Sequence, residues 1–246
     1  MAKITTDGNF PKRIGNYILY QLEGETIIRA KSGFTTEALK QSPKYDKSRK
    51  NASEFGRISS RCKDIRMALV GVLPKKNNLL VVNSFTKKMR EVMAFDTVSI
   101  RGERHLAMAL EVLEARQLLD GYLFNPATVL QLDCKELAAG WQLTLGAVPF
   151  VDGANCIGFR VHQLEIDLAN GTTQLTSSDW AFYTELVLPT SVLVPKLDET
   201  KTAGFCFTLL EAQFFICDAG SYTPLNNDTT KNVLVLKTSI GLVKGK

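Results

Sequence analysis

Residues 157–171 read Ile-Gly-Phe-Arg-Val-His-Gln-Leu-Glu-Ile-Asp-Leu-Ala-Asn-Gly, and this stretch decides the fold class of the chain. Residues 157–168 are rich in β-prone side chains, which predicts a strand. Successive side chains of a strand point to opposite faces, so Arg160, His162, Leu164 and Ile166 should share one face. Asn170-Gly171 is the strongest hairpin turn in the chain, because both residues tolerate positive φ. An antiparallel sheet is therefore expected here.

The same β-rich texture extends over the whole chain after Asp120-Gly121. Short runs recur between residues with turn propensity, at 129–132, 141–145, 180–188, 203–209, 212–217 and 233–237. About seven strands at this spacing are typical of an antiparallel β-sandwich. We therefore expect residues 121–246 to form a β-sandwich domain.

The first half of the chain has a helical pattern instead. The strongest helix is predicted at 50–73, where apolar residues recur every three or four positions and Pro74 follows. A second amphipathic helix is predicted at 79–95, so that the pair forms a helical hairpin. Residues 103–119 fit a third helix, although Leu106, Met108 and Leu110 also alternate like a strand.

Residues 16–29 carry two β-prone runs around Glu23-Gly24, which predict a β-hairpin, and the polar stretch 31–47 is expected to be an exposed loop. The fold class expected from these patterns is α+β. An N-terminal β-hairpin and a helical hairpin (residues 1–120) should pack with a C-terminal antiparallel β-sandwich (residues 121–246).

The charge of the chain is unevenly distributed. Residues 1–104 hold 21 Lys/Arg against 10 Asp/Glu, whereas residues 105–246 hold 9 against 15, within a formal net charge of +5. Such polarity suits binding of a polyanion by the basic half. It equally suits head-to-tail binding of a second copy.

Composition places the chain among globular proteins, with 45% hydrophobic and 22% charged residues. No signal peptide and no membrane span are expected, because every apolar run is short. The five cysteines form no C-x-x-C pair, so they are expected to be reduced, buried thiols in a cytoplasmic protein.

Catalytic and cofactor motifs are absent from the sequence. The chain has neither a phosphate-binding glycine loop nor a nucleophile elbow, and its 2 histidines offer little material for a catalytic pair. His162 is expected at the surface or at an interface. We therefore expect no enzymatic activity, no cofactor and no metal site.

The basic segment 40–66 is the best candidate for a binding surface. Its candidate binding residues are Lys40, Lys44, Lys47, Arg49, Lys50, Arg57 and Arg61. On a helix, Arg57 and Arg61 fall to one side of the apolar stripe while Lys63 and Arg66 fall to the other. This arrangement is typical of long cations that cover the edges of a buried stripe, and nucleic-acid binding remains the alternative.

Three motifs follow one another along the sequence. They are Gly15-Asn-Tyr-Ile-Leu-Tyr20 with Ile28-Arg29, then Arg49-x-Asn-x-x-Glu-Phe-Gly56, then Gly220-Ser-Tyr-Thr-Pro-Leu-Asn226. In this order the chain resembles a family of uncharacterised Bacteroidota proteins of similar length. The family has no established activity, so the resemblance implies no functional residues.

These observations favour a non-enzymatic structural or protein-interaction protein that binds itself or another protein, with Tyr17 and Tyr20 as candidate interface residues. A nucleic-acid-associated protein is the second hypothesis, and an enzyme with an unlisted motif is the third.

The cysteine pattern generates a first prediction. Adding reductant should leave the melting temperature unchanged, because no structural disulfide is expected. Thermal unfolding with and without dithiothreitol measures this, and a clear fall in melting temperature with reductant would contradict it.

Overall fold

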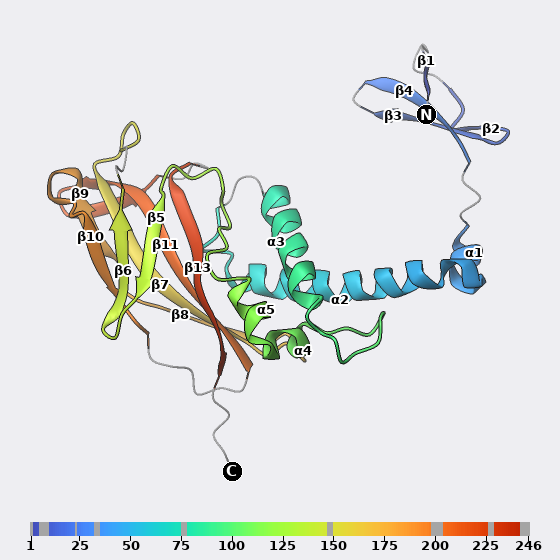
Figure 1. Cartoon of the computed structure of the whole chain (residues 1–246). Coiled ribbons are helices and arrows are strands. Elements are labelled where there is room, and N and C mark those ends of the chain that lie inside the picture. Colours follow the sequence, from blue (N-terminus) through green and yellow to red (C-terminus); the bar gives the residue numbers. More distant parts are fainter. Residues whose placement is uncertain are drawn as a thin grey trace. The chain divides into compact units, whose positions relative to one another are not determined.

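The computed structural model describes residues 2–4, 10–22, 24–31, 35–74, 78–146, 150–197, 204–225 and 229–241. It confirms the α+β class, with helices and antiparallel sheets (Figure 1). The chain divides into two compact units, Met1–Lys50 and Asn51–Lys246. The division lies at residue 50 rather than at residue 120, because the helices after residue 50 share a core with the C-terminal strands.

The N-terminal unit contains the predicted hairpin, formed by β3 (Tyr17–Leu22) and β4 (Glu25–Ala30). Strands β1 (Ala2–Ile4) and β2 (Arg13–Ile14) extend it to a four-stranded antiparallel sheet in the order β1-β4-β3-β2. Gly24 follows β3 with a φ of 82°, a left-handed conformation that glycine adopts at no steric cost.

The stretch 31–47, expected to be a loop, holds helical turns instead. Helix α1 (Thr36–Gln41) is capped by the Thr35 hydroxyl, which accepts a hydrogen bond from the Ala38 N–H. The 3₁₀ helix η1 (Pro43–Tyr45) follows. The polar residues of this stretch suggested a loop, but one of them, Thr35, caps a short helix.

Helix α2 spans Asp46–Ala68, so it begins and ends earlier than the predicted 50–73. Lys50 forms an ion pair with Asp46 one turn earlier, which supports the first turn. After Ala68 the backbone changes to tighter turns, with Val70 N–H donating to Met67 and Val72 N–H donating to Leu69. Pro74 therefore lies beyond the regular helix.

The second predicted helix is α3 (Asn78–Met93), and the third is broken into α4 (Leu106–Glu111) and α5 (Leu113–Gln117). The break is at Val112, whose ψ of 129° is extended. Arg116 Nη1 donates to the carbonyl oxygens of Leu110 (2.6 Å) and Glu111 (3.0 Å), which satisfies groups that the break leaves without helical partners.

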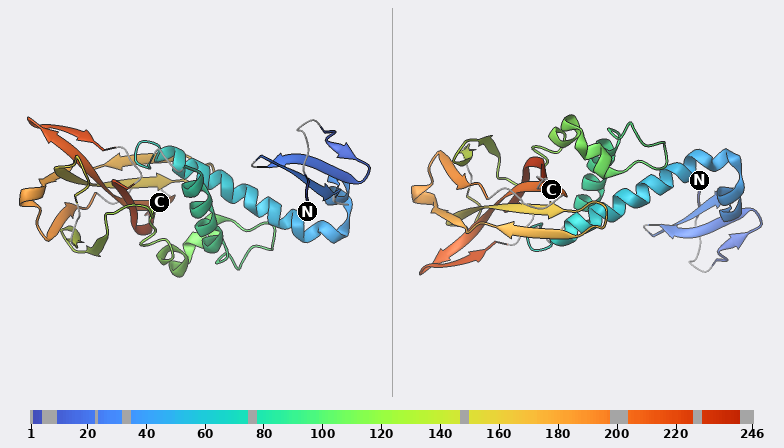
Figure 2. Two further views of the ribbon diagram at one scale, coloured as in Figure 1. Left: turned by 90° about the horizontal axis from the view of Figure 1, so that it is seen from above. Right: turned by 90° about the horizontal axis from the view of Figure 1, so that it is seen from below.

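We call the unit Asn51–Lys246 the body. The strands of the body form two antiparallel sheets (Figure 2). One has the order β10-β6-β5, from Ser191–Pro195, Gly140–Leu145 and Leu132–Glu136. In the other, β7 (Cys156–Ile166) pairs β11 (Gly204–Asp218) along its full length. Strands β12 (Ser221–Pro224) and β13 (Lys231–Gly241) pair the outer edge of β11, while β8 (Thr173–Ser177) and β9 (Ala181–Thr184) pair that of β7. The runs predicted at 203–209 and 212–217 are thus one strand, and the run predicted at 129–132 is displaced to 132–136.

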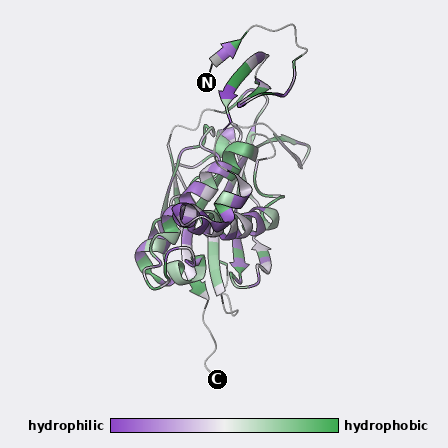
Figure 3. Cartoon of the chain, turned by 90° about the vertical axis from the view of Figure 1, so that its right-hand side faces the viewer, coloured by the Kyte–Doolittle hydropathy of each residue, from purple (hydrophilic) through white to green (hydrophobic). Residues whose placement is uncertain are grey.

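The β7–β11 sheet has a separate core on each face. Helices α2–α5 pack on one face against Leu164, Phe207 and Val235. The three-stranded sheet packs on the other face against Phe159 and Phe214. The packing of the three-stranded sheet on the β7–β11 sheet is the predicted sandwich. On the opposite face, the helices carry both hydrophobic and hydrophilic residues along their length, as the colours of Figure 3 show.

The packing of α2 generates a second prediction. Ile65 is 1% exposed, so Ile65→Asp would bury an unpaired charge and lower the free energy of unfolding by at least about 3 kcal/mol. The control is Met67→Asp on the same helix, where the side chain is 60% exposed and the expected change is within about 0.5 kcal/mol. Urea unfolding of both variants measures the difference, and equal stabilities would show that the Ile65 side chain faces solvent.

Candidate functional site

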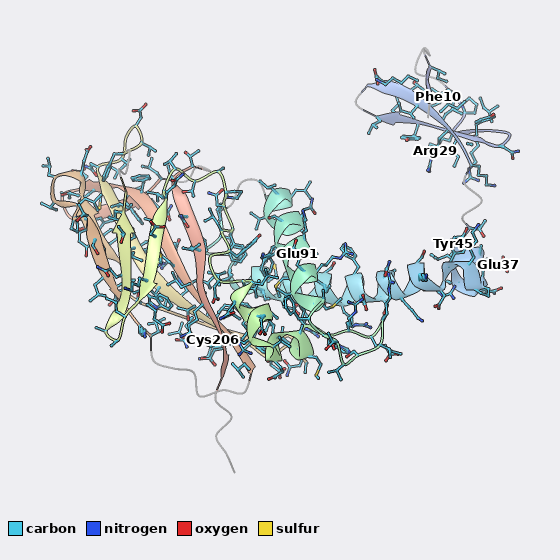
Figure 4. The ribbon with its side chains drawn as sticks, in the orientation of Figure 1. Phe10, Arg29, Glu37, Tyr45, Glu91 and Cys206 are labelled. Atoms are coloured by element: carbon cyan, nitrogen blue, oxygen red, sulfur yellow. The ribbon has the colours of Figure 1, made fainter. Side chains whose placement is uncertain are left out.

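The seven predicted basic residues fall into different roles. Lys40, Lys44 and Lys47 are exposed in the N-terminal unit and form no ion pair with any residue that the structure describes. The Lys44 ammonium lies 5.9 Å from the centroid of the Tyr45 ring, and Figure 4 shows Tyr45 beside the helical turns of this unit. These three lysines, hereafter the lysine group, are therefore available to an anionic partner.

Arg49 and Lys50 have structural partners instead. Arg49 Nη1 donates to the carbonyl oxygens of Leu39 (2.7 Å) and Ser42 (2.9 Å), and so joins α1 to the start of α2. Lys50 pairs with Asp46 at 3.0 Å. The Lys50 hydrogen bond is the largest influence on Asp46, and the net effect is a pKa below the ordinary value of that carboxyl.

Arg57 and Arg61 lie in the other compact unit. Arg61 pairs with Asp64 at 2.7 Å and donates to the Ala169 carbonyl at 3.0 Å, which fastens α2 to the β7–β8 turn. Arg57 donates to the carbonyl oxygen of Gly102 and to the Ser53 hydroxyl. The seven residues thus do not form one basic surface.

Tyr17 and Tyr20 lie on opposite faces of the N-terminal sheet, because they are an odd number of positions apart on β3. Tyr17 is 50% exposed and pairs across strands with Ile14, which is 52% exposed. Tyr20 lies 5.8 Å from the Arg29 guanidinium, and Figure 4 labels Arg29 on this sheet. The apolar surface is therefore Tyr17 with Ile14, not Tyr17 with Tyr20.

A second exposed surface lies where β7 begins, β9 ends and β11 ends. Asn155 joins these elements, since its backbone oxygen accepts from Glu185 N–H (3.2 Å) and its side chain exchanges hydrogen bonds with the Cys217 backbone. The exposed carboxylates Asp152, Glu185 and Asp218 lie here, together with Leu186 (96% exposed) and Val187 (68% exposed). We call these five residues the acidic tip. Within the described part of the chain its three carboxylates form no ion pair.

A buried charge cluster lies on the helix-covered face of the β7–β11 sheet. Glu211 is fully buried, and its carboxylate is contacted by Arg160 Nε (2.6 Å), Lys231 Nζ (2.5 Å) and His162 Nε2 (2.8 Å). The shared strand face of Arg160 and His162 follows from the predicted alternation. His162 is 0% exposed, so the expectation of a surface histidine is wrong. The missing information was Glu211, which comes from another strand and compensates for burial of the imidazole.

Burial is the largest influence on the Glu211 carboxyl and raises its pKa. The His162 hydrogen bond and the charges of Lys231 and Arg160 together outweigh burial, and the net pKa lies below the ordinary value of 4.5. Glu211 therefore stays ionised at neutral pH, and its negative charge is held by cations rather than by water.

An aromatic cluster adjoins these charges. The Arg160 guanidinium lies 4.3 Å from the centroid of the Trp180 ring, and the Phe182 and Tyr222 rings stack at 3.7 Å. A Cβ atom on Gly158 would collide with Trp180 and Phe182, so this position requires glycine for close packing.

Ser177, His162 and Glu211 form a hydrogen-bonded chain across three strands. Ser177 Oγ lies 2.7 Å from His162 Nδ1, and because the carboxylate only accepts, His162 Nε2 carries the proton toward Glu211. These residue types could serve as nucleophile, base and orienting acid. The surroundings of Glu211 differ from those of a carboxylate that serves a histidine base alone, because Arg160 and Lys231 also pair with it. This series of hydrogen bonds is therefore better suited to holding three strands together than to activating a serine.

Among the described residues, no group of three His, Cys, Asp or Glu side chains is placed to hold a metal ion. In the same part of the chain, no helix combines the length and apolar character required for crossing a membrane. The five cysteines are free thiols, and burial raises the pKa of Cys62 and Cys134 to about 12.

Comparison with known proteins found no match among protein-family models, curated proteins or solved structures. The resemblance to a Bacteroidota family therefore stays a hypothesis.

The cluster generates a third prediction. Glu211→Gln leaves Arg160 and Lys231 without their carboxylate, and should lower the free energy of unfolding at pH 7 by about 3–5 kcal/mol. The control is Glu136→Gln, which removes an exposed carboxylate from Lys196 and Lys237 and should cost within about 1 kcal/mol.

The pH dependence has a defined sign. A depressed pKa in the folded state stabilises the protein above pH 4.5, and this contribution is lost as pH falls through the folded-state value. Urea unfolding at pH 7, 4 and 3 should therefore show a smaller acid-induced loss for Glu211→Gln than for wild type. Parallel pH profiles of the two proteins would contradict the assignment.

Proposed function

We propose that the protein is a non-enzymatic interaction protein that assembles head to tail, with the N-terminal unit of one copy bound to the acidic tip of the next. The observation that carries the proposal is the division of charge. Residues 1–50 hold ten Lys/Arg against five Asp/Glu, so this unit accounts for the whole net charge of +5. A cytoplasmic location, expected from the sequence, is part of the proposal.

The body is neutral as a whole but internally polarised. Residues 105–246 hold 9 Lys/Arg against 15 Asp/Glu, and the remaining basic charge lies in residues 51–104. Among the described residues no ion pair joins 51–104 to 105–246, so the acidic tip is not neutralised by the helices. The lysine group and the acidic tip are thus complementary in sign and free to meet between copies.

Exposed apolar residues occur in the N-terminal unit as well as at the acidic tip. Tyr17 and Ile14 are about half exposed on the N-terminal sheet, and Leu186 and Val187 are exposed at the acidic tip. Charge steers association, whereas burial of apolar side chains supplies lasting affinity. Because two different surfaces meet, the contact is heterologous and builds a ring or a filament.

Nucleic-acid binding is the second candidate, because the lysine group is exposed and unpaired in the described chain. Three lysines suit phosphates as well as carboxylates. The acidic tip distinguishes head-to-tail assembly from nucleic-acid binding, since the carboxylates of Asp152, Glu185 and Asp218 would repel the phosphates of a nucleic acid.

The fourth prediction tests the pairing by charge reversal. Wild type should form assemblies at 50 mM salt that dissociate at 500 mM, since screening weakens exposed charge pairs. Changing the lysine group to Glu, or the three tip carboxylates to Lys, should each give monomers in light scattering after size exclusion. Mixing the two variants should restore assembly, because each then offers a surface complementary to the other.

The matched control reverses Lys63, Lys87 and Lys135, three exposed lysines of the body, and should leave assembly unchanged. Monomeric wild type at every salt concentration would overturn the proposal. Copurified nucleic acid that is lost with the lysine group but not with the tip variant would favour the second candidate.

A further inference from the structure

A cavity of about 670 Å³ lies in the body, bounded by α2, the end of α3, residues 104–108 and the β7–β8 turn. Its volume falls within the range of small-molecule sites in proteins, about 300–1,000 Å³. It lies within the Asn51–Lys246 unit and includes no residue of the acidic tip.

The cavity wall combines an apolar part with arginines. Ile58, Met93, Leu106 and Leu168 belong to the helix-side core and contribute the apolar part. Arg57, Arg61 and Arg104 contribute the cationic part. A site with both parts suits a ligand that has an apolar body and an anionic group.

The three arginines differ in their partners. Arg61 pairs with Asp64 at 2.7 Å, and Arg104 pairs with Glu54 at 3.0 Å. Among the residues that the structure describes, the partners of Arg57 are both neutral, namely the Gly102 carbonyl oxygen and the Ser53 hydroxyl. Its Nε is buried and, within the described chain, has no hydrogen-bond partner. A buried donor without an acceptor is costly, and a charged one more so.

We propose that this cavity binds a monoanionic amphiphile, a carboxylate on an apolar chain of the medium-chain fatty acid type. The carboxylate supplies the acceptor and the negative charge that Arg57 lacks, and the chain lies against the apolar wall. One uncompensated guanidinium matches one carboxylate, whereas a phosphate dianion would require a second. This binding activity is independent of head-to-tail assembly.

Gly56 permits a test that leaves every charge in place. It lines the cavity from α2, and a Cβ built there meets nothing within 4 Å. Gly56→Leu therefore adds a bulky side chain at the cavity wall without a backbone clash and raises helix propensity. The control is Ala52→Leu, at an exposed position one turn earlier on the same helix.

The experiment is calorimetric titration of the full chain with sodium decanoate at 500 mM salt, with 1-decanol as the neutral probe. Wild type and Ala52→Leu should bind decanoate with one saturable site, and Gly56→Leu should lose binding. Arg57→Gln should weaken decanoate at least tenfold and leave the affinity for 1-decanol within twofold.

Absence of saturable decanoate binding by wild type, or equal binding by Gly56→Leu, would overturn the proposal. Equal weakening of both probes by Arg57→Gln would show that Arg57 only maintains the fold there. Assembly is screened at this salt concentration, so these outcomes do not depend on it.

Discussion

The β7–β11 pairing is the constraint on which the body depends. Both strands extend beyond the layer that covers either face, so neither face can be uniformly apolar. On the helix side, the apolar zone ends at Leu164 and Leu209, and Glu211 comes next on β11. A carboxylate buried at that border requires cations from its neighbours, and β7 and β13 supply Arg160 and Lys231. Next to these cations, the aromatic cluster of Trp180, Phe182 and Tyr222 lies on the same face of the sheet.

The Glu211 cluster also shows why residue type and distance do not define a catalytic site. Ser177, His162 and Glu211 have the contacts of a hydrolytic triad. In a working triad the carboxylate stabilises an imidazolium that forms during the reaction. Here two cations already compensate that carboxylate, so it has little capacity left for a third. The two cations make burial of Glu211 tolerable, which is a structural role.

Local patterns in the sequence were sufficient for most of the helices and strands, although not for the helical turns within 31–47, and they did not reveal the long-range partners of the elements. The apolar spacing of Ile58, Cys62 and Ile65 identified the buried stripe of α2, and alternation placed Arg160 beside His162. Neither pattern predicts the hydrogen bond between His162 and Glu211, which are 49 positions apart in the sequence. The break at Val112 depends in the same way on a side chain, Arg116, that replaces helical partners. The cavity arginine was identified as basic, but its missing counter-charge required knowledge of Gly102 and Ser53.

The N-terminal unit raises a question of stability that bears on its role. Among its described residues the buried apolar side chains are only Leu19 and Ile27. A unit of about fifty residues normally needs more apolar burial, or a partner, to offset the entropy of ordering its backbone. Exposed Tyr17 and Ile14 are therefore not incidental, since covering them would contribute burial that the unit lacks. Its net positive charge adds self-repulsion, which an acidic partner would relieve. The proposed docking on the acidic tip would correct both deficits in one event, because that surface is acidic and carries exposed apolar residues.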